Sequence, residues 1–215
     1  MTMPSRALPA LAAALVLAGA GPAAALDWGI GVEGGYSEMT NASKSAKAIF
    51  DGSKGGGTIG GFVCIGLVQS FFLEAHGRHF QKTGERVFIA DPAGEVFHLG
   101  HPLTIRLIPV YGAIGYRFLP SSHFAPYVTI GLGATSYKET SDVAGLVETQ
   151  SATKFSGHGA LGVDYLAGPL RIGVEVGYST VPNTIGDSGV SKVYNEKDVG
   201  GLTVLARLAF GTRAP

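Results

Sequence analysis

The chain has 215 residues, with 16 Lys or Arg balanced by 16 Asp or Glu, so its formal net charge is zero. This length fits a single domain, and the balanced charge excludes the broad basic field that a nucleic-acid partner requires. Cys64 is the only cysteine, which excludes an internal disulfide and a cysteine zinc site.

The first 25 residues have the pattern of a secretory signal peptide. Arg6 precedes an apolar run from Ala7 to Ala18, and small residues follow at Ala23–Ala25. The apolar run is about 12 residues long, whereas a membrane-spanning helix needs about 20. We therefore expect cleavage after Ala25 and export of residues 26–215 as one domain.

Apolar and polar residues alternate with a period of two along the mature chain, and this pattern predicts eight strands. In 170–179, Leu170, Ile172 and Val174 share one face, whereas Arg171 and Glu175 share the other. Such a strand has one apolar face and one polar or small face. The predicted strands, in chain order, are 28–38, 56–67, 71–81, 103–118, 126–139, 153–166, 170–179 and 198–210.

Segment 103–118 contains Pro109, which cannot donate a ladder hydrogen bond. We expect a β-bulge there, because a bulge absorbs the missing donor and shifts the alternation by one residue. The shift would place on the outer face Leu103, Ile105 and Leu107 before the bulge, and Val110, Ile114 and Tyr116 after it.

The connections between the predicted strands alternate between long and short. The long ones are 39–55, 82–102, 140–152 and 180–197. Outer-membrane barrels join extended extracellular loops with tight periplasmic turns. The sequence therefore predicts an all-β fold, a closed antiparallel eight-stranded transmembrane β-barrel with both termini on the periplasmic side; a soluble β-sandwich is the alternative.

The polar faces of these strands predict a charged barrel interior. Buried charges are tolerated when they are paired, and Arg suits bidentate contact with carboxylates. We interpret these residues as a structural salt-bridge network; the alternative is that the acids form a catalytic or proton-conducting site with His76 or His158. The expected network comprises Glu33, Glu74, Asp164 and Glu175 with Arg78, Arg106, Arg171 and Arg207.

Aromatic residues near the ends of the predicted strands fit interfacial belts. At the periplasmic boundary we expect Trp28, Phe118, Tyr127 and Phe210, and at the outer boundary Tyr36, Phe80 and Tyr137.

Two small clusters of reactive side chains are candidate sites. His98 and His101 could bind a metal with Asp91 or Glu95, but no further ligand is fixed by the pattern. Ser156 and His158 point to the same side of one strand, without a firm third member of a triad. We therefore predict no catalytic, cofactor or metal site.

Residues 125–139 and 103–118, together with the export signal, resemble the bacterial outer-membrane β-barrel superfamily of OmpA-like, OmpW-like and opacity-type surface proteins. The resemblance implies a location in the bacterial outer membrane, with lipid as the surroundings. It also implies periplasmic chaperones and the barrel-assembly machinery as partners during export.

We expect a non-enzymatic structural or cell-surface role in which four extracellular loops contact a ligand outside the cell. Two other functions stay open. One is a narrow channel for small or apolar solutes, and the other is an outer-membrane lipid-modifying hydrolase.

Overall fold

The computed structural model describes residues 27–67, 70–90, 94–143 and 145–212, and the expected signal peptide, residues 1–25, lies outside them. No helix within these ranges combines the length and apolar composition needed to cross a bilayer. The strands are β1 (Trp28–Glu38), β2 (Gly55–Gly66), β3 (Phe71–Ala90), β4 (Glu95–Arg117), β5 (Phe124–Val143), β6 (Leu146–Ala167), β7 (Leu170–Thr180) and β8 (Leu202–Thr212).

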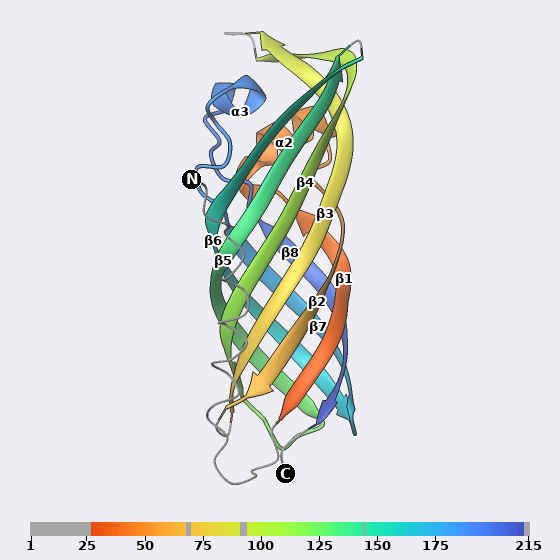
Figure 1. Ribbon diagram of the computed structural model, residues 1–215, viewed down its shortest axis with the longest axis vertical. Helices are drawn as coiled ribbons and strands as arrows, with labels where there is room; N and C mark the ends of the chain where they lie inside the picture. Colours follow the sequence, from red (N-terminus) through yellow and green to blue (C-terminus); the bar gives the residue numbers. More distant parts are fainter. Residues whose placement is uncertain (1–26, 68–69, 91–93, 144, 213–215) are drawn as a thin grey trace, which may run out of the picture.

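The eight strands form a closed antiparallel barrel, as the sequence predicted (Figure 1). Each strand pairs with the next one in the chain, and β1 pairs with β8 from Trp28–Thr212 to Ser37–Thr203. A bilayer offers backbone amides no partner, so a sheet can cross it only when no edge remains. The β1–β8 pairing removes that edge.

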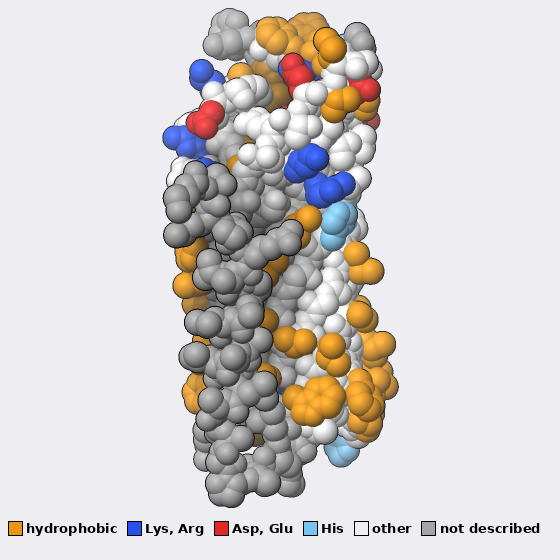
Figure 2. All heavy atoms as spheres, viewed as in Figure 1, with side chains coloured by type: hydrophobic (Ala, Val, Ile, Leu, Met, Phe, Trp, Pro, Cys, Tyr) orange, Lys and Arg blue, Asp and Glu red, His pale blue; other side chains and the backbone are white. Residues whose placement is uncertain are grey.

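The lower part of the barrel in Figure 1, where the short turns lie, has its apolar residues facing outward. Ile130 is 68% exposed and Val174 is 62% exposed, whereas Glu175 beside Val174 is buried. Apolar side chains gather over this part of the surface in Figure 2. Four of the residues expected in the aromatic belts are exposed, namely Trp28, Phe118, Phe210 and Tyr36. This surface therefore suits lipid.

The barrel wall has two heights. β1, β2, β7 and β8 have 11 or 12 residues, whereas β3, β4, β5 and β6 have 20–23. The expected loops 82–102 and 140–152 are therefore mostly strand, and they form two tall hairpins on one side (Figure 1). The short turns of outer-membrane barrels face the periplasm, so the tall hairpins rise on the extracellular side.

The expected bulge at Pro109 is wrong. β4 keeps one register against β5 from Leu107–Tyr137 through Pro109–Thr135 to Val110–Ala134. Against β3, pairing stops after Phe80–Leu107 and resumes in the same register at Gly77–Val110. The missing donor of Pro109 thus interrupts the ladder without shifting the alternation.

As a consequence, the outer-face assignment before Pro109 is also wrong. Leu103 and Ile105 are buried inside the barrel and Leu107 is partly buried there, whereas Val110 and Ile114 face outward as expected. Two residues expected in the outer aromatic belt, Phe80 and Tyr137, are likewise buried on the inner face.

The two remaining connections cover the inside of the tall wall. The β1–β2 connection forms η1 (Thr40–Ala42) and α2 (Ser43–Ile49), and the β7–β8 connection forms α3 (Gly189–Val193). Ala42, Ala46 and Ile49 pack into an apolar cluster with strand residues such as Ile105 and Tyr137. This extracellular core explains why the upper strand residues turn apolar side chains inward.

Candidate functional site

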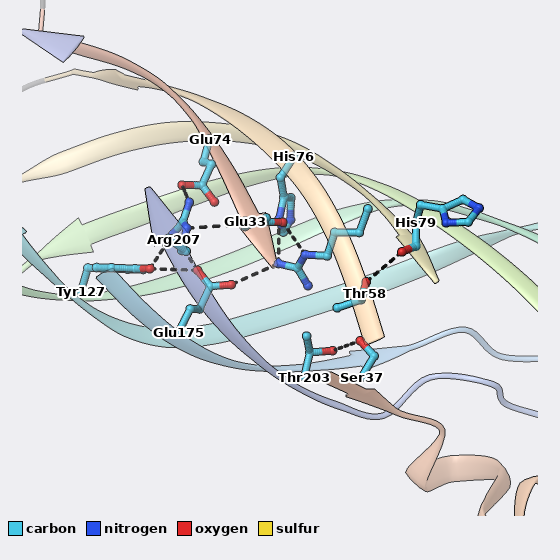
Figure 3. Close-up of polar contacts among 11 residues, drawn as sticks. Glu33, Ser37, Thr58, Glu74, His76, His79, Tyr127, Glu175, Thr203 and Arg207 are labelled. Carbon is cyan, nitrogen blue, oxygen red and sulfur yellow. Dashed lines mark hydrogen bonds and ion pairs between the residues drawn. The ribbon is translucent and has the colours of Figure 1, made fainter. Parts of the chain in front are cut away.

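Arg207 on β8 is the centre of a buried charged layer that crosses the lower barrel (Figure 3). Its Nη1 donates to Glu175 Oε2 at 2.7 Å, and its Nη2 donates to Glu74 Oε2 at 2.5 Å. The guanidinium also lies 3.8 Å from the centre of the Phe62 ring and donates to the Tyr127 hydroxyl at 2.5 Å. Tyr127 in turn donates to Glu175 Oε2 at 2.9 Å.

Arg78 on β3 forms the second centre of the layer. Its Nε donates to Glu33 Oε1 at 2.5 Å, and its Nη2 donates to Glu175 Oε1 at 3.1 Å. Nη2 also lies 2.8 Å from His76 Nδ1. Glu175 therefore bridges both arginines, and the layer joins β1, β3, β5, β7 and β8 across the interior.

Gly60 on β2 leaves the space that the Arg78 side chain needs. In the ladder it lies between Glu33 on β1 and Arg78 on β3. A Cβ atom at Gly60 would lie 2.9 Å from Arg78 Cγ and 2.4 Å from the carbonyl oxygen of Gly77. Because the second atom belongs to the backbone, a side chain at this position would displace the strand or the arginine.

The structure brings together five of the eight residues expected in the network, namely Glu33, Glu74, Arg78, Glu175 and Arg207. Arg171 instead belongs to a second cluster at the periplasmic end. It pairs with Asp27, which also accepts from Arg117 Nη1 at 2.8 Å. Asp164 lines a small space near this cluster with Arg117, Arg171 and Arg207.

Arg106 is the clear error among the expected network residues. It is exposed on the outer face of β4, where its Nε donates to Gln81 Oε1 at 3.1 Å. Because the alternation continues through Pro109, even-numbered residues of β4 from Pro102 to Tyr116 face outward, and Arg106 is one of them. Asp27, Arg117 and His76 take part in the buried clusters but were absent from the expected set.

Tyr127 was expected in the periplasmic belt but is buried in the lumen, 2% exposed. The alternation of 126–139 already placed it on the same face as Thr129 and Gly131. The alternation predicts the face of Tyr127 correctly, because the closeness of a residue to a strand end says little about which face it occupies.

Ser156 and His158 both point into the lumen, as two residues separated by one position on a strand should. The Ser156 hydroxyl accepts from Thr135 Oγ1 at 3.0 Å, and the His158 ring stacks on Tyr111 with ring centres 5.0 Å apart. In the described part of the barrel, no carboxylate bonds to the His158 ring, so the geometry lacks the third group that orients a catalytic histidine.

A metal site in the second predicted loop gains no support from the described residues, which contain no group of three suitable ligands. His98 Nδ1 lies 3.2 Å from Glu85 Oε2 instead. Asp91, one of the expected ligands, lies outside the described residues.

The charged layer leaves little open space in the lumen. A cavity of about 50 Å³ lies above it, lined by residues that include Arg78, Tyr111 and Thr203. A second space of about 10 Å³ lies below it, beside Glu74 and Arg207. A cavity of this kind needs about 10–15 Å³ to hold one water molecule, so the upper space can hold a few waters and the lower space at most one.

A larger cavity of about 330 Å³ opens at the extracellular end, between the tall hairpins and the two helical connections. Its apolar side is formed by Met39, Ile49, Val87, Leu103 and Ile105. This volume lies within the range of small-molecule sites, which combine apolar walls with a few polar groups.

The polar side of this extracellular cavity comes from β5, β6 and the β7–β8 connection. Glu139 accepts a hydrogen bond from the Tyr137 hydroxyl, and Ser141 lies two residues further along the same face of β5. Ser141 is 4% exposed, and its hydroxyl has no partner in the described protein. Buried hydroxyls are normally hydrogen-bonded, so Ser141 presents an unused polar group to the cavity.

Glu196 holds the extracellular end together. Its two carboxylate oxygens accept from the backbone N–H groups of Lys44 and Ser45 at 2.9 and 2.8 Å, and Oε2 also accepts from Ser45 Oγ at 2.6 Å. These N–H groups belong to the first turn of α2, where a helix favours negative charge. The β7–β8 connection is thereby fastened to the β1–β2 connection.

A closed sheet with an apolar outer belt and a charged, filled interior defines a small outer-membrane β-barrel protein. Residues 10–204 match the family described as "Outer membrane protein beta-barrel domain", so the chain belongs to this family and is placed in the outer membrane. No curated protein sequence matches the chain.

Solved structures with the same fold include outer membrane protein OprG from Pseudomonas aeruginosa, at 14% identity and a TM-score of 0.53, covering 88% of this chain and 95% of that one. A major outer membrane protein from Thermus thermophilus is similar at 14% identity and a TM-score of 0.52, covering 87% and 99%. Neisserial surface protein A is similar at 11% identity and a TM-score of 0.50, covering 86% and 95%. At these identities the likeness concerns the fold alone.

Proposed function

We propose that the protein is a non-enzymatic surface protein that binds a small ligand, or one side chain of a larger partner, in its extracellular cavity. The observation that carries this proposal is the 330 Å³ cavity with the unused hydroxyl of Ser141. Lipid surrounds the belt, and the proposed export route after cleavage at Ala25 requires periplasmic chaperones and the barrel-assembly machinery.

The charges around the cavity favour a cationic ligand with an apolar body. Arg86 is paired with Glu148 at 2.8 Å, which leaves Glu139 and Asp187 as the unbalanced charges of the lining. An amine can donate to the Glu139 carboxylate and the Ser141 hydroxyl while its apolar part contacts Leu103 and Ile105.

Matched probes test this proposal. In detergent, 2-phenylethylamine should raise the unfolding temperature of the mature protein more than phenylacetate, which has a similar shape and the opposite charge. Glu139→Gln and Ser141→Ala should each weaken the effect. Glu38→Gln should not, because Glu38 pairs with Lys54 and does not line this cavity. Equal effects of the two probes, or no effect of either, would contradict the proposal.

The filled lumen argues against the alternative of a narrow channel. Planar bilayers containing the protein should show no reproducible single-channel steps. Steps that change in size in Arg207→Met, but not in the outer-face control Arg106→Gln, would instead establish a conducting pore through the charged layer.

The hydrolase alternative depends on Ser156 and His158, which make other contacts in the lumen. We expect no hydrolysis of phospholipid or lipid A above the rate of Ser156→Ala. A difference between the two proteins would support an enzyme.

A further inference from the structure

Two basic side chains stand directly opposite each other on the outer face of the tall wall. Arg106 on β4 and Lys138 on β5 are direct partners in the ladder, and both are exposed. Like charges directly opposite each other in an antiparallel pair are destabilising. Within the part of the chain that the structure describes, neither side chain forms an ion pair that would offset the repulsion.

The neighbours of this pair on the outer face carry no carboxylate. Gln81 faces Arg106 from β3, and Ser151 faces Lys138 from β6. The adjacent outward positions along the strands are His79, Thr83, Thr104, Ile108, Ser136, Thr140 and Thr153. The surface thus concentrates positive charge and hydrogen-bond donors without an internal counter-ion.

The pair also lies at a defined depth. On β4 the outward residues below Arg106 are Ile108, Val110 and Ile114, and on β5 Leu132 and Ile130 precede Lys138. In Figure 2, basic side chains lie above the apolar surface, with a histidine side chain just below them. Arg106 and Lys138 are therefore the first outward-facing charged residues above the belt on β4 and β5, at the depth where the headgroups of the outer leaflet begin.

We propose that Arg106 and Lys138 form a binding site for the phosphate group of a phosphorylated glycolipid in the outer leaflet. A phosphate between the two cations converts their repulsion into two charge-assisted contacts, and the planar guanidinium suits a phosphate oxygen pair. Gln81 accepts from Arg106 Nε, which orients the guanidinium on the surface. Acyl chains of the same lipid would lie along the apolar belt below.

Diphosphoryl lipid A in mixed micelles with the mature protein tests this site. Each basic residue near an anionic surface contributes roughly a fivefold gain in affinity. Arg106→Gln combined with Lys138→Gln should therefore weaken lipid A binding by about thirtyfold. The exchanged variant Arg106→Lys with Lys138→Arg should keep most of the affinity, because it preserves both charges.

The matched control is Lys192→Gln with Lys197→Gln, two exposed lysines of the β7–β8 connection. It removes the same charge and should leave affinity unchanged. Without lipid, the Arg106 and Lys138 double variant should unfold at about the same temperature as wild type, since the relief of repulsion offsets the loss of the exposed hydrogen bond from Arg106 to Gln81.

Several results would overturn the site. Equal affinity of wild type and the double variant would do so, as would an equal loss in the lysine control. Binding of dephosphorylated lipid A as tight as binding of the diphosphoryl form would show that phosphate is not recognised. Stabilisation by inorganic phosphate alone to the same extent would show that the ligand is the free anion and not a lipid.

Discussion

Arg207→Met will leave a long side chain in the lumen while removing the cation that pairs with three carboxylates. The Arg207 side chain is 3% exposed, and the Glu33, Glu74 and Glu175 side chains are also buried. Removing one partner of a buried pair costs about 3–5 kcal/mol, because the other charge is left uncompensated. We expect the free energy of unfolding to fall by about that amount.

Glu74→Gln tests whether Glu74 and Arg207 are energetically coupled. Glu74 pairs with Arg207 alone, at 2.5 Å, so Glu74→Gln in the wild-type background should cost about 1–2 kcal/mol. In the Arg207→Met background the same change removes an unpaired buried charge, so it should restore stability. The effect of Glu74→Gln is thus expected to change sign between the two backgrounds.

The assay is urea unfolding in lipid vesicles, followed by the gel mobility of unheated samples. Trp28, the only tryptophan, lies at the lower end of the outer surface and gives an independent fluorescence signal. If Glu74→Gln destabilises both backgrounds equally, or if Arg207→Met costs less than about 1 kcal/mol, the charged layer does not act as a coupled network.

Three further predictions concern the ends and the wall of the barrel. Asp27→Asn should cost about 1–3 kcal/mol in the same urea assay, because Arg117 and Arg171 lose their shared carboxylate; an unchanged midpoint would contradict this. Gly133→Ala should reduce the fraction that folds, since its Cβ would lie 1.9 Å from the Val110 carbonyl oxygen, whereas Gly57→Ala, with nothing within 4 Å, should fold normally in a gel-shift assay. Glu196→Gln should speed protease cleavage of the β1–β2 connection, because the first turn of α2 loses its anion; an unchanged cleavage rate would show that packing alone holds the helix.

The strand count, the closure of the barrel and most of its charged layer could be predicted from alternation alone. In the lower barrel the outside is lipid and the inside is polar, so the face of Glu33, Glu175 or Arg207 follows directly from its apolar neighbours. The predicted faces are wrong where the surroundings of the strands change from lipid to water.

Above the belt the polarity of the two faces is reversed. Leu103 and Ile105 face the core beneath α2, and Arg106 faces water or headgroups, although β4 keeps one register. A reversal of polarity along one strand looks, in sequence, the same as a shift of alternation by a bulge. The extracellular cavity could not be predicted either, because it depends on how two connections far apart in the chain pack on the tall hairpins.

The contacts of Glu196 with α2 bear on the strength of the junction between β1 and β8. Both connections flank the junction where the first and last strands meet, and the N–H of Asn41 donates across it to the carbonyl oxygen of Gly200 at 3.1 Å. These contacts join residues from opposite ends of the chain across the β1–β8 junction. The two helical connections therefore add hydrogen bonds of their own to the pairing that joins β1 and β8 at the extracellular end.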